Sequence, residues 1–93
     1  MITGFADKKT ELFFRRGTCP PAWRAVAEVA KRKLDMLDAA VILTDLRAPP
    51  GNHMEPLKGD RKGQHSIRVN DRWRVCFVWT KLGPSQVEIV DYH

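Results

Sequence analysis

Residues 65–80 read HSIRVNDRWRVCFVWT, and this stretch decides the fold. Large apolar residues recur at every second position on both sides of Asn70, which is typical of two strands that each bury one face. A two-residue turn would pair Ile67 with Arg74 and mix apolar with charged positions. A three-residue loop instead pairs Ile67 with Val75 and keeps one face wholly apolar, so we choose that register. The predicted hairpin consists of strand 65–69, loop 70–72 and strand 73–80.

The first half of the chain has helical spacing. A short helix is predicted over residues 8–14, with Leu12 and Phe13 on its buried side, and Gly17 ends it. A second helix opens at Pro20-Pro21 and runs to about residue 38. Its buried stripe is expected to comprise Trp23, Val26, Ala30, Leu34 and Leu37.

The second half of the chain is rich in strand patterns. Strands are also predicted at residues 2–5, 53–57 and 86–90, with one further helical turn within 39–46, a polar loop at 58–63 and a turn at 83–85. Helices followed by strands indicate an α+β fold, in which the N-terminal helices pack on a small, mainly antiparallel C-terminal sheet.

Length and charge limit the possible functions. The 93 residues suffice for one domain, residues 1–93, with one core and little room for a large internal cavity. The formal net charge of +5 favours an anionic partner, such as nucleic acid, an acidic protein or an anionic membrane surface.

The cysteines and the N-terminus indicate a cellular compartment. Two cysteines, Cys19 and Cys76, are too few for a disulfide or zinc framework. No apolar stretch resembles a secretory signal or a membrane span. We therefore expect a cytoplasmic protein with reduced thiols, no metal site and no membrane association.

Basic residues concentrate between positions 58 and 74, against Asp60 and Asp71. The chosen register also places Arg68 opposite Arg74, and like charges so placed destabilise a ladder. A phosphate held between the two guanidinium groups would offset this cost. The alternative is a solubilising face whose arginines pair with nearby acids. The basic residues of this segment are Lys58, Arg61, Lys62, Arg68, Arg72 and Arg74.

The same region carries a resemblance to a known family. The motifs are EPLKGDRKG at 55–63, SIRVN at 66–70, WRV at 73–75 and the ending DYH at 91–93. Together they resemble HigB-type toxins of the RelE/ParE superfamily of bacterial toxin–antitoxin systems. The resemblance implies a microbial-RNase-like (RelE-like) fold and an endoribonuclease that cuts mRNA in the ribosomal A site. It also implies a helix-turn-helix antitoxin, HigA, as partner, and contact with operator DNA only through the antitoxin complex.

The resemblance also assigns roles to particular residues. Lys58 and Arg74 match the family's basic groups at the phosphate, and Asp91, Tyr92 and His93 match its C-terminal catalytic residues. Glu55 stands where some members have histidine, and Arg72 stands where some have asparagine, so the general base and general acid stay open. His53 is a further candidate for the missing histidine. The expected RNA-binding residues are Arg61, Lys62, Arg68 and Arg72.

RNA supplies its own nucleophile, the 2′-hydroxyl, so these residues would need no metal or cofactor. A base removes the hydroxyl proton, cations stabilise the phosphorane, and an acid protonates the leaving 5′-oxygen, and His93 is a candidate for either proton transfer. Two other functions remain open. One is a ParE-like toxin that inhibits gyrase without nuclease activity, and the other is a non-catalytic RNA-binding module.

Overall fold

The hairpin forms with the predicted register in the computed structural model, which describes residues 1–91. Strand β2 (His65–Arg68) pairs antiparallel with β3 (Trp73–Thr80). Ile67 lies opposite Val75, and Arg68 lies opposite Arg74. The Asn70 side chain accepts hydrogen bonds from the backbone N–H groups of Arg72 and Trp73, which closes the three-residue loop.

The hairpin is the centre of a four-stranded antiparallel sheet with the order β1-β2-β3-β4. Strand β1 (Glu55–Pro56) forms one edge and β4 (Gly83–Asp91) lies on the other side of β3. The strand predicted at 53–57 is thus only two residues long. His53 has a left-handed backbone (φ 42°), and Pro56 has no N–H to extend the ladder.

The turn predicted at 83–85 was wrong, because those residues belong to β4, which is also longer than the predicted strand 86–90. The chain reverses at residues 81–82, where the Thr80 hydroxyl accepts from the Leu82 N–H and donates to the Gly83 carbonyl. A Cβ atom at Gly83 would lie 2.3 Å from the Met1 carbonyl oxygen, and the φ of Gly83 is +124°. Glycine therefore serves there for close approach rather than for the turn itself.

The helices lie where they were predicted, with changed ends. Helix α1 (Lys8–Arg16) is capped by the Asp7 carboxylate and ends at Gly17 (φ 73°). Phe13 is buried as expected, whereas Leu12 is only half-buried and Thr10 takes the second buried position. The Thr10 hydroxyl accepts a 3.1 Å hydrogen bond from the N–H of Ile89, which fixes α1 to the sheet.

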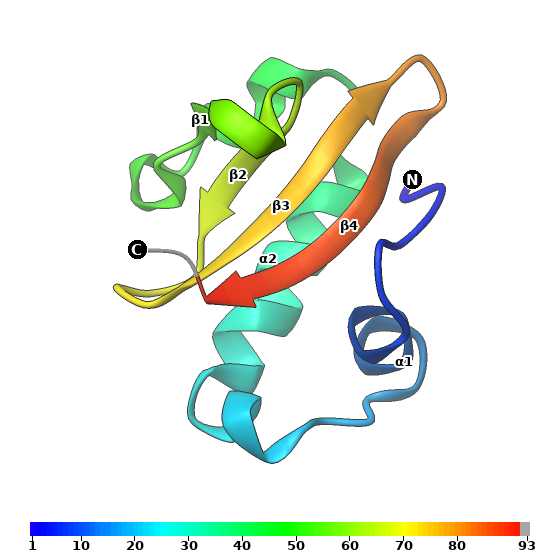
Figure 1. Ribbon diagram of the computed structural model, residues 1–93, viewed down its shortest axis with the longest axis vertical. Coiled ribbons are helices and arrows are strands. Elements are labelled where there is room, and N and C mark those ends of the chain that lie inside the picture. The colour runs from blue at the N-terminus through cyan, green and yellow to red at the C-terminus, as the bar shows by residue number, and fades with distance from the viewer. Residues whose placement is uncertain (92–93) are drawn as a thin grey trace.

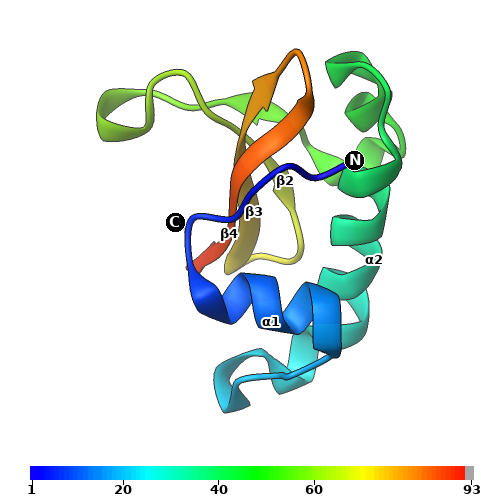
Figure 2. The same ribbon diagram turned by 90° about the vertical axis from the view of Figure 1, so that its right-hand side faces the viewer.

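The second predicted helix is divided in two. A 3₁₀ segment, η1 (Pro21–Val26), leads into α2 (Ala27–Ala39). All five residues of the predicted stripe are buried and form the core with the inner face of the sheet. Figure 1 shows α2 crossing behind the sheet, and Figure 2 shows α2 along one side of it and α1 below it, near the end of β4. The α+β prediction is therefore confirmed.

The strand predicted at residues 2–5 was wrong. This segment runs along β4, as Figure 2 shows, but only Phe5 forms a bridge, with Val87. Pro84 has no N–H, and Gln86 has a left-handed backbone (φ 51°), so this edge of β4 cannot support a regular ladder.

The connection between α2 and the sheet contains two short 3₁₀ helices, η2 (Leu43–Arg47) and η3 (Pro50–Asn52). The first is the predicted additional turn within residues 39–46 in 3₁₀ form. A third 3₁₀ turn, η4 (Gly59–Arg61), lies within the predicted polar loop. Within residues 1–91, every helix is too short or too polar to span a bilayer.

Candidate active site

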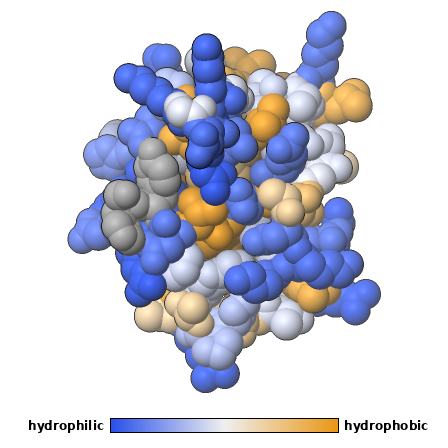
Figure 3. Space-filling view, in the orientation of Figure 1, coloured by the Kyte–Doolittle hydropathy of each residue, from blue (hydrophilic) through white to orange (hydrophobic). Residues whose placement is uncertain are grey.

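The outer face of the sheet, which points away from α2, gathers the predicted site residues. Alternation along β2 and β3 sends Ile67, Val75 and Phe77 into the core and leaves Arg68 and Arg74 on the opposite side. Figure 3 views this face, on which hydrophilic side chains surround a small apolar spot. The outer face is thus the charged surface predicted from the sequence.

The Arg74 side chain is held by three neighbouring residues of this face. Its Nε donates to the Ser66 hydroxyl at 2.7 Å, and its Nη2 donates to the His53 backbone carbonyl at 2.6 Å. The Glu55 carboxylate lies 3.7 Å from the same Nη2. The side chain is only 12% exposed, and Nη1 makes no hydrogen bond with residues 1–91. That nitrogen can therefore donate to an anion, while the other contacts fix the orientation of the guanidinium group.

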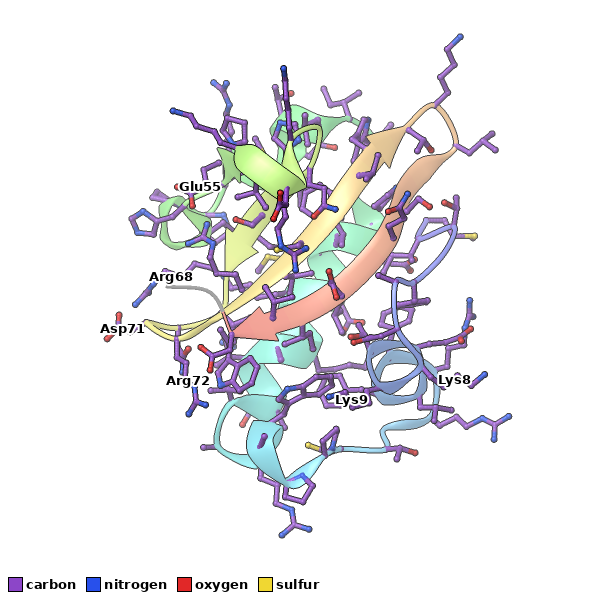
Figure 4. All side chains as sticks on the ribbon, viewed as in Figure 1. Lys8, Lys9, Glu55, Arg68, Asp71 and Arg72 are labelled. Atoms are coloured by element: carbon purple, nitrogen blue, oxygen red, sulfur yellow. The ribbon has the colours of Figure 1, made fainter. Side chains whose placement is uncertain are left out.

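The other arginines of the face have acidic partners. Arg68 pairs with Asp71, and Figure 4 shows both at the tip of the hairpin. Arg72 pairs with Asp91 at 2.8 Å and also lies over the Trp73 ring. These pairs, with Glu55 beside Arg74, offset the predicted opposition of Arg68 and Arg74. The register behind that prediction is confirmed, and the protein's own carboxylates supply negative charge.

Arg61 enters the face from η4. It pairs with Glu88 of β4 at 2.7 Å and with the Gln64 side chain at 3.0 Å, so the loop is tied to the sheet. Lys58 and Lys62 flank this turn and are exposed. Neither lysine forms an ion pair within the described part of the chain. Within residues 1–91, these two ammonium groups are therefore the loop cations that no ion pair neutralises.

The candidates for proton transfer are separated by the fold. Glu55 is half-exposed next to Arg74, whereas Asp91 ends β4 opposite Trp73. The hydrogen bond from Arg74 to His53 is made to the backbone carbonyl and not to the imidazole ring. Tyr92 and His93 lie outside the described residues. The structure therefore brings Glu55 to Arg74 and Asp91 to Arg72, and no hydrogen bond or ion pair described within residues 1–91 joins these two pairs.

Two contributors to the site were missed from the sequence. Ser66 is fully buried and orients Arg74 from the neighbouring strand, and the period-2 alternation could have placed it on the same face. The His53 carbonyl depends on a left-handed backbone at a non-glycine residue, for which the sequence holds no clear signal.

A buried polar cluster supports the loop that contains His53. Asn52 is fully buried, and its amide donates to the carbonyls of Leu46 and Ala48 at 3.1 and 3.2 Å. Its carbonyl oxygen accepts from Lys33 Nζ of α2 at 2.5 Å. Burial lowers the pKa of Lys33 below 10.5, and the charges of Arg32 and Arg68 add to this effect. The cluster links α2 to the residue that precedes His53.

Cys76 lies under the outer face and is inaccessible to solvent. Burial raises the pKa of its thiol above 9.0, although the charges of Arg61 and Arg74 act in the opposite direction. A protonated, buried thiol is a poor nucleophile. Within residues 1–91, no three histidine, cysteine or acidic side chains converge as metal ligands. The chemistry offered by the described residues is stabilisation of negative charge, with carboxylates adjacent to it.

A helix-backed antiparallel sheet with this charged outer face is consistent with the class of RelE-like toxins. The family model for the RelE-like toxin of the type II toxin–antitoxin system HigB matches residues 3–93. The chain therefore belongs to the HigB-like toxin family, which confirms the resemblance seen in the sequence motifs. A type II system implies an antitoxin as partner.

Curated relatives agree with this assignment. Toxin HigB-1 of Vibrio cholerae serotype O1 is 43% identical over 82 residues, which cover 85% of this chain and 84% of the relative. Endoribonuclease HigB of Proteus vulgaris is 29% identical over 93 residues and is matched over the full length of both chains.

Proposed function

We propose that this toxin is an endoribonuclease that cleaves mRNA in the A site of translating ribosomes and thereby inhibits translation. The observation that carries the proposal is Arg74, a nearly buried guanidinium group on the cationic outer face with one nitrogen that has no partner among residues 1–91. Family membership and the name of the Proteus vulgaris relative, Endoribonuclease HigB, support the reaction class.

The proposed reaction begins with the RNA 2′-hydroxyl, which attacks the adjacent phosphorus as a base removes its proton. The bond from phosphorus to the 5′-oxygen then breaks, and that oxygen takes a proton from an acid, which leaves a 2′,3′-cyclic phosphate. Arg74 and Lys58 stabilise the charge on the phosphorane oxygens. Glu55 lies beside Arg74 and is a candidate base, while Asp91, Tyr92 and His93 are proposed to complete the catalytic set.

Substrate binding is assigned to the remaining cations of the outer face, Arg61, Lys62, Arg68 and Arg72. The carboxylate partners of the three arginines would be exchanged for phosphate oxygens, which costs little at exposed pairs such as Arg68–Asp71. The proposed antitoxin is a HigA-like helix-turn-helix protein, and operator DNA is contacted only through that complex. A ribosomal target places the activity in the cytoplasm.

The test is induction of the chain without its antitoxin, followed by primer extension on cellular mRNA. We expect growth arrest and discrete cuts within translated codons, both absent when translation initiation is blocked beforehand. A matched induction of Arg74→Ala controls for the burden of expression. Intact mRNA together with trapped gyrase–DNA complexes would contradict the proposal and favour a ParE-like gyrase inhibitor. Bound but uncut mRNA would favour a non-catalytic RNA-binding module.

A further inference from the structure

A pocket of about 430 Å³ lies between η2, η3, the edge strand β1 and its neighbour β2. It is separate from the outer face, because its floor includes His65, whose ring stacks on the core residue Phe77 at 6.2 Å. Leu43, Met54 and Pro56 provide apolar walls. The pocket is within the size range of small-ligand sites, about 300–1,000 Å³.

His65 lines this pocket and also holds a buried polar atom without a partner in the described part of the chain. Its Nδ1 is buried and makes no hydrogen bond with any of residues 1–91. Buried polar atoms without partners are rare in folded proteins, because each has lost its hydration without replacement. Because that nitrogen has almost no accessible surface, a ligand in the pocket would satisfy it only after a shift of the His65 ring, as donor or as acceptor according to the tautomer.

The lining indicates the chemistry of the ligand. Apolar walls with an imidazole at the floor suit a flat ring that carries hydrogen-bonding groups on its edge. Arg47 is the charged side chain of the lining and is a cation, so the ligand or its attached group should be anionic. A nucleobase attached to a phosphate backbone meets all of these requirements.

His53 connects the pocket with the candidate active site. It lines the pocket, and its left-handed backbone (φ 42°) directs its carbonyl to Arg74 Nη2 at 2.6 Å. Backbone strain of this kind persists only where the surroundings hold it, and it is frequent at ligand sites. The edge strand β1 contributes one residue to each site. Glu55 lies near Arg74, and Pro56 lines the pocket.

We propose that this pocket, which we call the His65 pocket, binds one base of the cleaved RNA, close to the phosphate at Arg74. The inference rests on the proposed function and extends it. The RNA backbone lies on the outer face, passes the two-residue edge strand β1, and places one base against the His65 ring. This contact contributes to the sequence preference of cleavage, since an imidazole edge distinguishes among base edges.

The test uses single-turnover cleavage on ribosomes programmed with a set of mRNAs, each with one abasic nucleotide near the cut. We expect one position at which loss of the base slows cleavage by about tenfold or more, as for other bases stacked on protein rings. Thr44 is exposed and lines the pocket, so Thr44→Trp should fill it without disturbing the core. In that variant, the ratio of rates with and without the base should fall to about one.

Two further variants sharpen the test. Leu82→Trp adds the same ring at an exposed residue outside the pocket lining, and it should keep the wild-type ratio. His65→Phe keeps a stacking ring but removes the ring nitrogens. Cleavage by this variant should still slow when the base is removed, but the cleavage rate should depend less on which base is present. Thermal unfolding of each variant verifies that it is folded.

The outcomes separate this inference from the proposed function. An unchanged ratio in Thr44→Trp, with normal cleavage, would overturn the His65 pocket alone. Normal cleavage together with weakened antitoxin binding in that variant would also overturn it and assign the pocket to the antitoxin. Absence of mRNA cleavage by the wild-type protein would overturn both.

Discussion

Arg74 Nη2 and the backbone carbonyl of His53 form a 2.6 Å hydrogen bond that joins the centre of the sheet to the loop at its edge. Residues 53 and 74 are far apart in the chain, and only the docking of that loop brings them together. Through the neighbouring Asn52, the same loop is bonded to Lys33 of α2. The orientation of the candidate phosphate-binding arginine therefore depends on both layers of the fold.

Replacing Arg74 with lysine should reduce single-turnover mRNA cleavage by about 100-fold, as for the loss of one preorganised charge-stabilising donor. Lysine keeps the charge but cannot bond Ser66 and His53 while it donates to phosphate. Arg24→Lys makes the same exchange at an exposed position and should change cleavage less than threefold. Equal rates for the two variants would show that charge alone suffices at Arg74.

Replacing Asn52 with alanine should lower the free energy of unfolding by about 3 kcal/mol, because two carbonyls and the Lys33 ammonium lose buried partners. Urea denaturation gives the value. Asn70→Ala is the comparison, since Asn70 bonds two backbone N–H groups of a partly exposed turn and should cost about 1 kcal/mol. If both variants lost the same stability, burial of the Asn52 cluster would not be the cause.

Replacing Gly83 with alanine should be among the most destabilising glycine substitutions. The added Cβ would meet the Met1 carbonyl oxygen at 2.3 Å, and the backbone is left-handed there. We expect a loss of at least about 2 kcal/mol and a fall in Tm of roughly 8 °C or more. Gly51→Ala meets nothing within 4 Å and should leave Tm nearly unchanged in the same calorimetric experiment. Similar Tm values for the two variants would contradict the close approach.

The buried Cys76 thiol should make the protein less stable in alkali. Its pKa is raised above 9.0 in the folded state, so the folded state holds its proton longer than the unfolded chain does. Its contribution to stability is fully present below pH 9.0 and is lost as the pH rises towards the folded pKa. Cys76→Ser should therefore show a shallower decline in unfolding free energy above pH 9, by up to about 1.4 kcal/mol per pH unit.

Cys19 provides the control for this pH dependence, because it is a second free thiol that is only partly buried. Cys19→Ser should retain the wild-type decline. The idea fails if Cys76→Ser and the wild type lose stability in parallel between pH 8 and pH 10.5.

Deletion of Tyr92 and His93 should abolish mRNA cleavage while ribosome binding largely persists, because the cations of the outer face remain. Moving the histidine two residues further, by inserting two glycines before it, should not restore cleavage, since proton transfer requires hydrogen-bond reach. Cleavage and binding are measured in parallel on programmed ribosomes. Full activity of the truncated protein would remove the tail from the mechanism, and loss of both properties would indicate a docking role.

The spacing of apolar residues along the chain and the residues typical of turns were sufficient to predict most of the fold. The alternation in residues 65–80 identified the register, because a one-residue slip would have buried Arg74 in the core. The helical stripe from Trp23 to Leu37 identified the buried face of the second helix. The errors fall at edges, where Pro84 was taken for a turn residue and residues 2–5 for a regular strand. At an edge a strand pairs on one side only, so the sequence pattern constrains it less.

The sequence by itself determined the α+β class, the hairpin register, the accumulation of cations in residues 58–74 and the family motifs. These are local or periodic properties, which depend on neighbouring residues and not on the rest of the chain. Only the tertiary structure decided which acid each arginine meets, that Ser66 and the His53 carbonyl hold Arg74, and that a pocket opens beside His65. Those contacts join segments distant in sequence, and they depend on a left-handed backbone and on how a loop docks against a helix, which no local pattern encodes.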